Sequence, residues 1–479
     1  MKIYKFTCIL LLSLFSTACK DALVEKPLDF TSPNNYFNNS VEAKASVYSL
    51  YNTLVNGNAY NISMYCLADF PSLSLDSEPG FADAVQLDNF TIDANLPLLN
   101  YYEAAYTGIL RANLILERVP PIQMDAAERD ALLAEARFMR AFHYFNLVRF
   151  WGDVPLVTTS SLDLTKAVNN SRTDKAQIYS LIKEDLLFAD KALPVSYPPT
   201  EVGRSTKGAA KLLLSKVYLT LKEFDLARIK SKEVIDLGVY KLMTDYRDVF
   251  DPVKKNNAEH IFSAQYKMFR VGSWFEAILS PPGTTGCAFG EGVGSVAKKF
   301  YDEYPTSYRK EVSMITTYTS TNGTVFNYKK PFVKKYIAWG KEDVCFSSEH
   351  NFPIMRYADA LLVFAEAENE VSGPTAGAYD AINQIRKRAR TYPNGKEDKV
   401  SMPDLASLTK ESFRQAVYKE REMELCFEGQ GFFDLVRTGR LITENKAIGK
   451  SNVSEKHLLM PLSQRALDLN QGLKQNPGY

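Results

Sequence analysis

The segment from Ala126 to Phe150 constrains the fold more than any other part of the chain. Its apolar residues, among them Met139, Phe142 and Phe145, recur at steps of three and four residues, which is the period of an α-helix. Aromatic side chains such as Phe138 lie on a second side of that helix. A helix that is apolar on most sides is buried on most of its surface, so we expect the rest of the chain to pack around it.

The two ends of this helix are also marked in the sequence. Asp125 is a capping residue, and Glu128 three positions later completes a capping-box pattern. The helix must stop at Trp151-Gly152-Asp153, before Pro155. At the usual rise per residue it would be about 37 Å long. We therefore predict a long scaffold helix, with Trp151 and His143 as part of its buried surface.

Length and composition limit the number of subdomains, the kind of partner and the size of the core. The chain has 479 residues, which is more than one minimal core needs, so several layers or subdomains are expected. Its formal net charge of +1 gives no reason to expect a polyanionic partner such as nucleic acid. Aromatic residues make up 12% of the chain, which indicates a large core and some aromatic surface.

The N-terminus has the pattern of a targeting segment. Lys2 and Lys5 precede the apolar run Phe6–Phe15, which is too short to span a bilayer, so residues 1–18 are predicted to be a signal peptide. The small residues before Cys19 resemble the lipobox of bacterial lipoproteins, in which the cysteine thiol takes a diacylglyceryl group. Lipid on Cys19 would hold the protein on a membrane without a spanning helix. The alternative is an ordinary signal peptide with Cys19 incidental.

No cofactor or metal motif is found. The chain has four His residues, with no H-E-x-x-H spacing and no Cys/His cluster. Beyond the N-terminal segment, four cysteines lie far apart, and either one disulfide or buried thiols would fit them: Cys66, Cys287, Cys345 and Cys426.

Helical periodicity returns along most of the chain. Two pairs of helices are expected, residues 208–221 with 223–237 and residues 356–371 with 375–390, and in each pair a short turn joins the two helices. The Tyr and the Glu-Phe-Asp sequence of the first pair resemble a tetratricopeptide repeat. Together with the pair that the long helix forms, they predict a scaffold of helix pairs. The expected helices are Val41–Leu54, Tyr101–Val119, Asp174–Leu193, Gly208–Leu221, Glu223–Leu237, Arg356–Val371, Thr375–Arg390 and Leu408–Phe427. In the last of them, Arg421, together with Arg437 beyond it, is expected to pair with acids of the segment Glu420–Glu428.

Two regions lack sustained helical period. Residues 56–100 are rich in Asp, Ser, Asn, Gly and Pro but keep several aromatic residues, which argues against disorder. Residues 266–350 contain many glycines and short β-prone stretches, Met314–Tyr318 and Phe332–Ile337, on either side of the hairpin signal Asn322-Gly323.

In combination and order, several motifs resemble the SusD/RagB family of surface glycan-binding lipoproteins. Nearly the whole chain takes part, with the weakest likeness in residues 56–100 and 266–350. Gly431 departs from the family, which commonly carries a large basic residue there, and is expected to loosen the packing. The motifs are C-K-D from Cys19, R-A-N from Arg111, E-A-R-F-M-R-A-F-H-Y-F-N-L-V-R-F-W-G-D-V-P-L from Glu135, R-Y-A-D-A-L-L-V-F-A-E-A from Arg356, A-I-N-Q-I-R-K-R-A from Ala381, E-R-E-M-E-L-C-F-E-G from Glu420, F-D-L-V-R-T-G from Phe433 and the final N-P-G-Y.

The resemblance implies a mainly α fold, with tetratricopeptide-like helix pairs, long irregular loops and a few short β-strands. It also implies a lipid-anchored protein of the outer membrane, facing the exterior, that sits as a lid on a SusC-like TonB-dependent barrel. The expected divisions are the signal peptide 1–18, a lipidated tether and arm 19–40, an N-terminal region 41–265 with the insertion 56–100, and a C-terminal region 266–479 with the insertion 266–350.

In this family the glycan site is built from the two irregular regions. Sugars present apolar C–H faces to aromatic rings and hydroxyl groups to carboxylates and amides. The candidates for aromatic stacking are Trp274 and Phe275, then Trp339, Tyr65 and Phe81, each with a packing role as the alternative. Asp76, in L-D-S-E-P, is a candidate polar contact, although a solvated turn fits it as well.

We therefore expect a protein that captures an oligo- or polysaccharide and passes it to the barrel transporter. No nucleophile motif such as G-x-S-x-G is present, and we expect no enzymatic activity. The alternative function is a peptide-capturing or purely structural lid of such a transporter.

Overall fold

A computed structural model describes residues 36–160, 170–268, 270–274, 278–282, 292–319, 323–337 and 348–479. The chain is mainly helical, as predicted. Within these ranges no helix combines the length and the apolar character that crossing a bilayer requires. The longer helices are α2 (Ser40–Val55), α5 (Tyr101–Arg118), α6 (Ala126–Trp151), α8 (Lys175–Ala192), α9 (Lys207–Thr220), α10 (Phe224–Asp236), α14 (Tyr357–Ser372), α15 (Ala376–Arg390) and α16 (Lys410–Glu424).

The long helix α6 is confirmed at both ends. The side chain of Asp125 accepts a hydrogen bond from the Glu128 amide at 2.9 Å, and Gly152 ends the helix with a positive φ of 71°. Side chains on several sides of α6 are fully buried, as the sequence predicted. Trp151 is among them, and its Nε1 donates to the Pro461 carbonyl at 2.8 Å, so this residue belongs to the scaffold.

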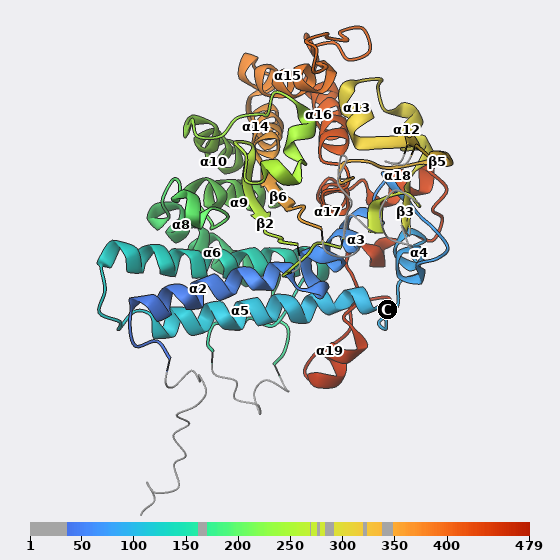
Figure 1. The fold of residues 1–479 in the computed structure, drawn as a ribbon. Coiled ribbons are helices and arrows are strands. Elements are labelled where there is room, and N and C mark those ends of the chain that lie inside the picture. The colour runs from blue at the N-terminus through green and yellow to red at the C-terminus, as the bar shows by residue number, and fades with distance from the viewer. Residues whose placement is uncertain are drawn as a thin grey trace, which may run out of the picture.

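The helices pack in a row that largely follows the order of the chain. In Figure 1, α2, α5 and α6 lie together in the lower part of the molecule, α8, α9 and α10 follow above them, and α14, α15 and α16 complete the row. Each helix contacts its neighbours in the row, which is the arrangement of stacked helix pairs that the periodicity predicted.

The region 56–100 is more helical than its sequence pattern indicates. It contains the short helices α3 (Ser63–Asp69) and α4 (Ala82–Asp88), with a π-helical turn over Gly57–Asn61 and a 3-10 turn over Pro97–Asn100. Every residue of α3 is buried. A short helix that is buried on all sides has no polar face, so it leaves no helical period in the sequence.

In the part of the chain that the structure describes, the β-structure consists of three two-stranded sheets. They pair β1 (Leu75–Ser77) with β3 (Gly294–Val296), β2 (His260–Ala264) with β6 (Phe352–Arg356), and β4 (Met314–Thr319) with β5 (Val325–Val333), all antiparallel. The hairpin β4–β5 was predicted, but its second strand was placed too late. The strand begins at Val325, and residues 334–337 after it form a buried turn.

The remaining helices are short. They are α12 (Lys298–Glu303), α13 (Tyr308–Ser313), α17 (Gly431–Arg437), α18 (Leu441–Ala447) and α19 (Gln464–Leu469). At Gly431 the chain packs closely, because an added Cβ would lie 2.5 Å from the Cβ of Ser72. The expectation of loose packing at Gly431 is therefore wrong.

Acidic residues of α16 and the turn after it pair with different cations from those predicted. Arg421 binds Asp359 and Asp434, and Arg437 binds Glu366 and Asp434. Glu420, Glu424 and Glu428 instead meet basic residues from elsewhere in the chain, namely Arg309, Lys335, Arg356, Arg386 and Arg388. Residues next to each other on a helix point in different directions, which is why Arg421 does not reach Glu420.

Cys66 and Cys426 are buried free thiols, and burial raises the pKa of each. Cys287 and Cys345 lie outside the described residues, so the disulfide alternative for that pair stays a prediction.

Candidate functional site

The two irregular regions meet along a short antiparallel ladder. Strand β1 pairs with β3 in the register Leu75↔Val296 and Ser77↔Gly294. The ladder continues beyond both strands, because the Glu78 amide donates to the Val293 carbonyl at 2.9 Å and the Ala297 amide donates to the Ser74 carbonyl at 3.0 Å. We call this contact between residues 56–100 and 266–350 the seam.

Trp274 is held at the seam through its backbone. Its amide donates to Oδ1 of Asn61 at 2.6 Å, and Nδ2 of Asn61 donates back to the Gly272 carbonyl at 3.3 Å. The Trp274 carbonyl accepts from the Ile278 amide at 3.1 Å. Trp274 is 39% exposed, although tryptophan is usually well buried. An anchored backbone therefore presents a large aromatic ring at the surface.

The hairpin β4–β5 carries a second group of aromatic side chains beside the seam. Tyr318 lies opposite Phe326 in the ladder, with ring centroids 6.4 Å apart, and Phe326 is nearly parallel to Tyr328 at 6.5 Å and 7°. All three are partly exposed. We call Tyr318, Phe326 and Tyr328 the hairpin aromatics.

The segment 278–282 connects Trp274 to the hairpin. Ile278 is bonded to Trp274, and the Pro282 carbonyl accepts a hydrogen bond from the Tyr328 hydroxyl at 3.1 Å. Strand β5 also contacts β3, and in Figure 1 the two lie close together at the right of the molecule. The hairpin aromatics are thus attached to the same structural unit as Trp274.

Charged groups border this aromatic surface. Nζ of Lys330, on β5, is 2.9 Å from Oε1 of Glu78, which follows β1. Asp76 lies within β1, opposite Ser295, and burial raises the pKa of its carboxyl. Asp76 is therefore part of a strand and not of the solvated turn that was the alternative.

No group of three His, Cys, Asp or Glu residues in the described part of the chain could hold a metal ion.

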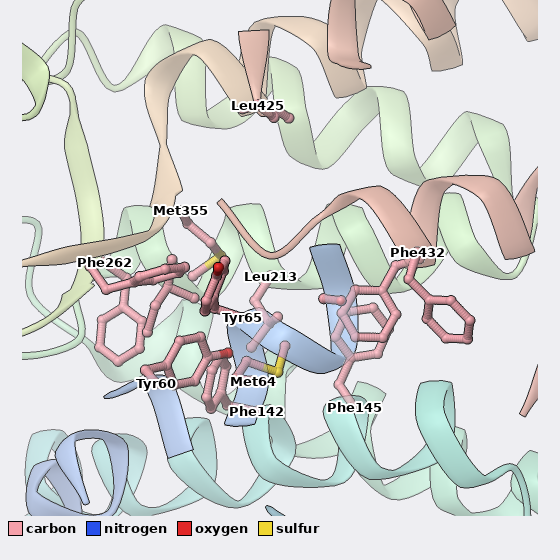
Figure 2. Close-up of a cluster of buried hydrophobic side chains, with 14 of the residues drawn as sticks. Tyr60, Met64, Tyr65, Phe142, Phe145, Leu213, Phe262, Met355, Leu425 and Phe432 are labelled. Atoms are coloured by element: carbon pink, nitrogen blue, oxygen red, sulfur yellow. The ribbon is translucent and has the colours of Figure 1, made fainter. Parts of the chain in front are cut away.

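Tyr65 does not belong to the exposed surface. Its side chain is 0% exposed, and Figure 2 shows it in a buried cluster with Tyr60, Met64 and Met355. Its ring packs 6.1 Å from that of Phe70. The predicted stacking role of Tyr65 is therefore wrong, because α3 is enclosed on all sides.

The other predicted residues have different outcomes. Phe81, just before α4, is partly buried against the core, so only part of its ring faces outward. Phe275, Trp339 and the proposed lipidation site Cys19 lie outside the described residues, and their roles stay predictions.

The hairpin aromatics are not among the residues that the sequence predicted for the site. The signal that could have found them was present, since Phe326 and Tyr328 are separated by one residue directly after the Asn322-Gly323 turn. Side chains two positions apart in a strand point to the same face. Because the second strand was predicted to begin at residue 332, Phe326 and Tyr328 were not recognised as neighbours on one face of a strand.

The arrangement suits a ligand with flat apolar faces and many hydroxyl groups. Exposed aromatic rings pack against apolar faces, and carboxylate, amide and ammonium groups at the border accept or donate hydrogen bonds. The surface lies on two segments that the helical scaffold holds in place.

Two family models match the chain. One, described as "SusD family", matches residues 283–479, and the other, described as "Starch-binding associating with outer membrane", matches residues 28–219. Together they cover most of the helical scaffold and the end of the chain.

Full-length relatives and solved structures agree with these matches. SusD-like protein P2 from Formosa agariphila is 28% identical over 524 aligned positions, covering 100% of both chains. A SusD superfamily protein from Parabacteroides distasonis has a TM-score of 0.82 and 26% identity over 92% of this chain and 99% of its own. A laminarin-binding SusD-like protein has a TM-score of 0.77 and 25% identity over 92% of this chain and 100% of its own.

Proposed function

The chain belongs to the SusD/RagB family, and on this premise we propose that it binds a glycan at the seam, with Trp274 as the central stacking residue. The observation that carries the proposal is the exposed Trp274 ring on a backbone that Asn61 and Ile278 anchor on both sides. The similarity to a laminarin-binding relative supports a saccharide as the ligand.

The hairpin aromatics extend this surface in the proposal. Two nearly parallel rings, Phe326 and Tyr328, are 6.5 Å apart along an extended strand. Such a row can contact more than one sugar of a chain, whereas Trp274 alone can contact one face. The proposed ligand is therefore an oligo- or polysaccharide and not a single sugar.

We further propose that the protein holds its glycan without cleaving it. Incubation with a bound glycan should release no reducing ends. Their appearance, at a rate that depends on the protein, would contradict this part of the proposal.

The membrane anchor and the transporter partner are also proposals. Lipid on Cys19 would place the protein on the outer membrane, and the description of one matching family model names that membrane. Delivery of the glycan to a SusC-like TonB-dependent barrel would be the next step. Mass spectrometry of the mature N-terminus and co-purification with such a barrel are the direct measurements.

Substitution of one exposed ring tests glycan binding. Trp274→Ala should weaken the affinity for a bound glycan by about tenfold or more, because a central aromatic contact is lost. The melting temperature should stay nearly unchanged, since Trp274 is already 39% exposed in the folded protein. Calorimetric titration against a panel of glycans, with affinity gels for polysaccharides, gives both the ligand and the affinity.

Tyr48→Ala is the matched control, because Tyr48 is 38% exposed but lies on the scaffold helix α2. Its affinity for the glycan should equal that of the unaltered protein. Unchanged affinity in Trp274→Ala would contradict the proposed site, and binding of peptides with no glycan bound would favour a peptide-capturing lid.

A further inference from the structure

A cleft of 1180 Å³ lies between scaffold helices and the C-terminal segment. Its walls come from the end of α6, the start of α8, the turn after α9, helix α17 and residues near the C-terminus. It is slightly larger than the roughly 300–1,000 Å³ of common small-molecule sites. The cleft shares no lining residue with the seam, so it is a separate place on the molecule.

The cleft contains a guanidinium group, that of Arg149, which forms no ion pair with a carboxylate of the described residues. Arg149 lies over the rings of Phe433 and Phe145, at 3.6 and 4.0 Å from their centroids. Its Nε donates to the Phe145 carbonyl at 3.2 Å and its Nη2 donates to Oδ1 of Asn146. Among the described residues it forms no ion pair. Burial lowers the pKa of Arg149 to about 10.

A guanidinium without a carboxylate partner is unusual between two aromatic rings. Charged groups that leave water are normally paired, because losing hydration costs free energy. An anion that entered the cleft would recover that cost by bonding to the guanidinium in a partly dry environment.

Other cations in the lining add to the positive potential. Among the described residues, the Arg172 guanidinium donates only to carbonyl and amide oxygens, including the carbonyls of Trp151 and Asp153, each at 2.7 Å. Lys175 and Lys456 also form no ion pair in the described ranges of the chain. The lining thus holds five basic side chains, counting Arg437, against three acidic ones.

The acidic residues of the lining help to choose between ligand classes. Asp153, Asp174 and Glu455 would repel a peptide rich in acidic residues. The same carboxylates can accept hydrogen bonds from the hydroxyl groups of a saccharide. A saccharide with one or two negative charges therefore satisfies both kinds of lining residue.

We propose that this cleft binds an acidic saccharide, with the Arg149 guanidinium bonded directly to its carboxylate or sulfate group. The inference rests on the proposed glycan-binding function and adds a second site to it.

Calorimetric titration of the full chain tests the second site. The probes are a galacturonic acid trisaccharide, a sulfated trisaccharide, a neutral trisaccharide and a tetraglutamate peptide. We expect at least one acidic trisaccharide to bind, with an affinity that falls as salt is added. The carboxylate and sulfate probes distinguish the two sources of negative charge. Arg149→Met should weaken this binding by about tenfold or more, because a charged hydrogen bond is lost.

Three further measurements keep the result interpretable. Arg149→Met keeps an apolar stem over the two rings, so its melting temperature shows whether the fold is intact, and Arg149→Lys should retain part of the affinity. Arg118→Met, at the exposed end of α5, is the control and should bind normally. A purely structural Arg149 would lower the melting temperature of Arg149→Met and leave binding unchanged.

The inference is overturned if neither acidic trisaccharide binds, if the neutral one binds equally well at this site, or if Arg149→Met keeps full affinity. Binding of tetraglutamate alone would also overturn it and would indicate a protein partner. If all glycan binding depended on Trp274, the proposed cleft site would be contradicted and the proposed site at the seam would be supported. If binding depended on Arg149 and none depended on Trp274, the cleft site would be supported and the site at the seam would be contradicted.

Discussion

His143 is a buried base at the contact between two scaffold helices. Its Nε2 is 3.0 Å from Oγ1 of Thr53, and its Nδ1 has no partner among the described residues. Burial lowers the pKa of His143 to about 3. In the unfolded chain this histidine has its ordinary pKa of 6.5. Between pH 6.5 and about pH 3 the imidazole is therefore protonated in the unfolded chain and neutral in the folded one.

This residue should make the protein less stable in mild acid. The contribution is fully present above pH 6.5 and is lost as the pH falls toward 3. Between about pH 7 and pH 5 the loss should be about 2 kcal/mol in the free energy of unfolding. His143→Gln should show a smaller loss over the same range by denaturant titration, whatever its stability at neutral pH. Parallel pH profiles for the two proteins would contradict the assignment.

Individual ligand-contact residues could be predicted only in part. Trp274 is exposed as its polar, glycine-containing surroundings indicated, whereas Tyr65 in a similar setting is buried. The difference depends on α3, a helix that has no polar face and so leaves no period in the sequence. Whether a loop aromatic faces solvent is decided by contacts with distant parts of the chain, which local patterns do not contain.

At the level of elements, the contact between α5 and α6 depends on one glycine. A Cβ added at Gly108 would lie 2.2 Å from Nε2 of His143. Gly108→Ala should therefore destabilise the protein by about 1–3 kcal/mol, because the imidazole is held in a packed core. Thermal and urea unfolding measure the change.

Gly377, in α15, provides the matched control. A Cβ there would lie 3.7 Å from the ring of Phe364, which is an ordinary contact. Gly377→Ala should be neutral or stabilising by up to about 1 kcal/mol, because alanine favours the helix. Equal effects of the two substitutions would show that close packing at Gly108 is not the cause.

Elements were predicted best where their residues make local, repeated contacts. The eight helices expected outside α6 were found with ends shifted by a few residues at most. The hairpin was recognised by its turn, but its second strand was misplaced because the first half of β5 mixes aromatic side chains with polar and charged ones. The pairing of β1 with β3 could not be predicted at all, since three-residue strands carry almost no signal.

At the scale of the whole molecule, a buried group of charges joins distant elements. Nη1 of Arg356, at the end of β6, is 2.8 Å from Glu259 and 2.6 Å from Glu424, and Nε is 2.7 Å from Glu428. Burial alone would raise the pKa of Glu424, but the guanidinium groups of Arg388, Arg356 and Arg309 hold it well below its usual range. The group therefore stays charged inside the protein.

Arg356→Met should cost about 3–5 kcal/mol, because it leaves buried carboxylates without their partner. Arg414→Met is the control, since Arg414 pairs with Glu370 near the surface, and its loss should cost about 1 kcal/mol or less. Chemical denaturation of both variants gives the comparison. A small effect in Arg356→Met would mean that the remaining cations of the group compensate for it.

The anchoring of Trp274 by Asn61 has a consequence for how the molecule is made. The two residues are 213 positions apart in the chain, and β1 and β3 are separated by a similar span. Contacts of such high contact order close long loops and form late in folding, whereas the neighbouring helices of the row can assemble as the chain emerges. The seam should therefore become ordered after the neighbouring helices of the row have packed. A chain that stopped before residue 274 would lack both Trp274 and β3, and with them the proposed ligand surface, so only finished copies would compete for ligand.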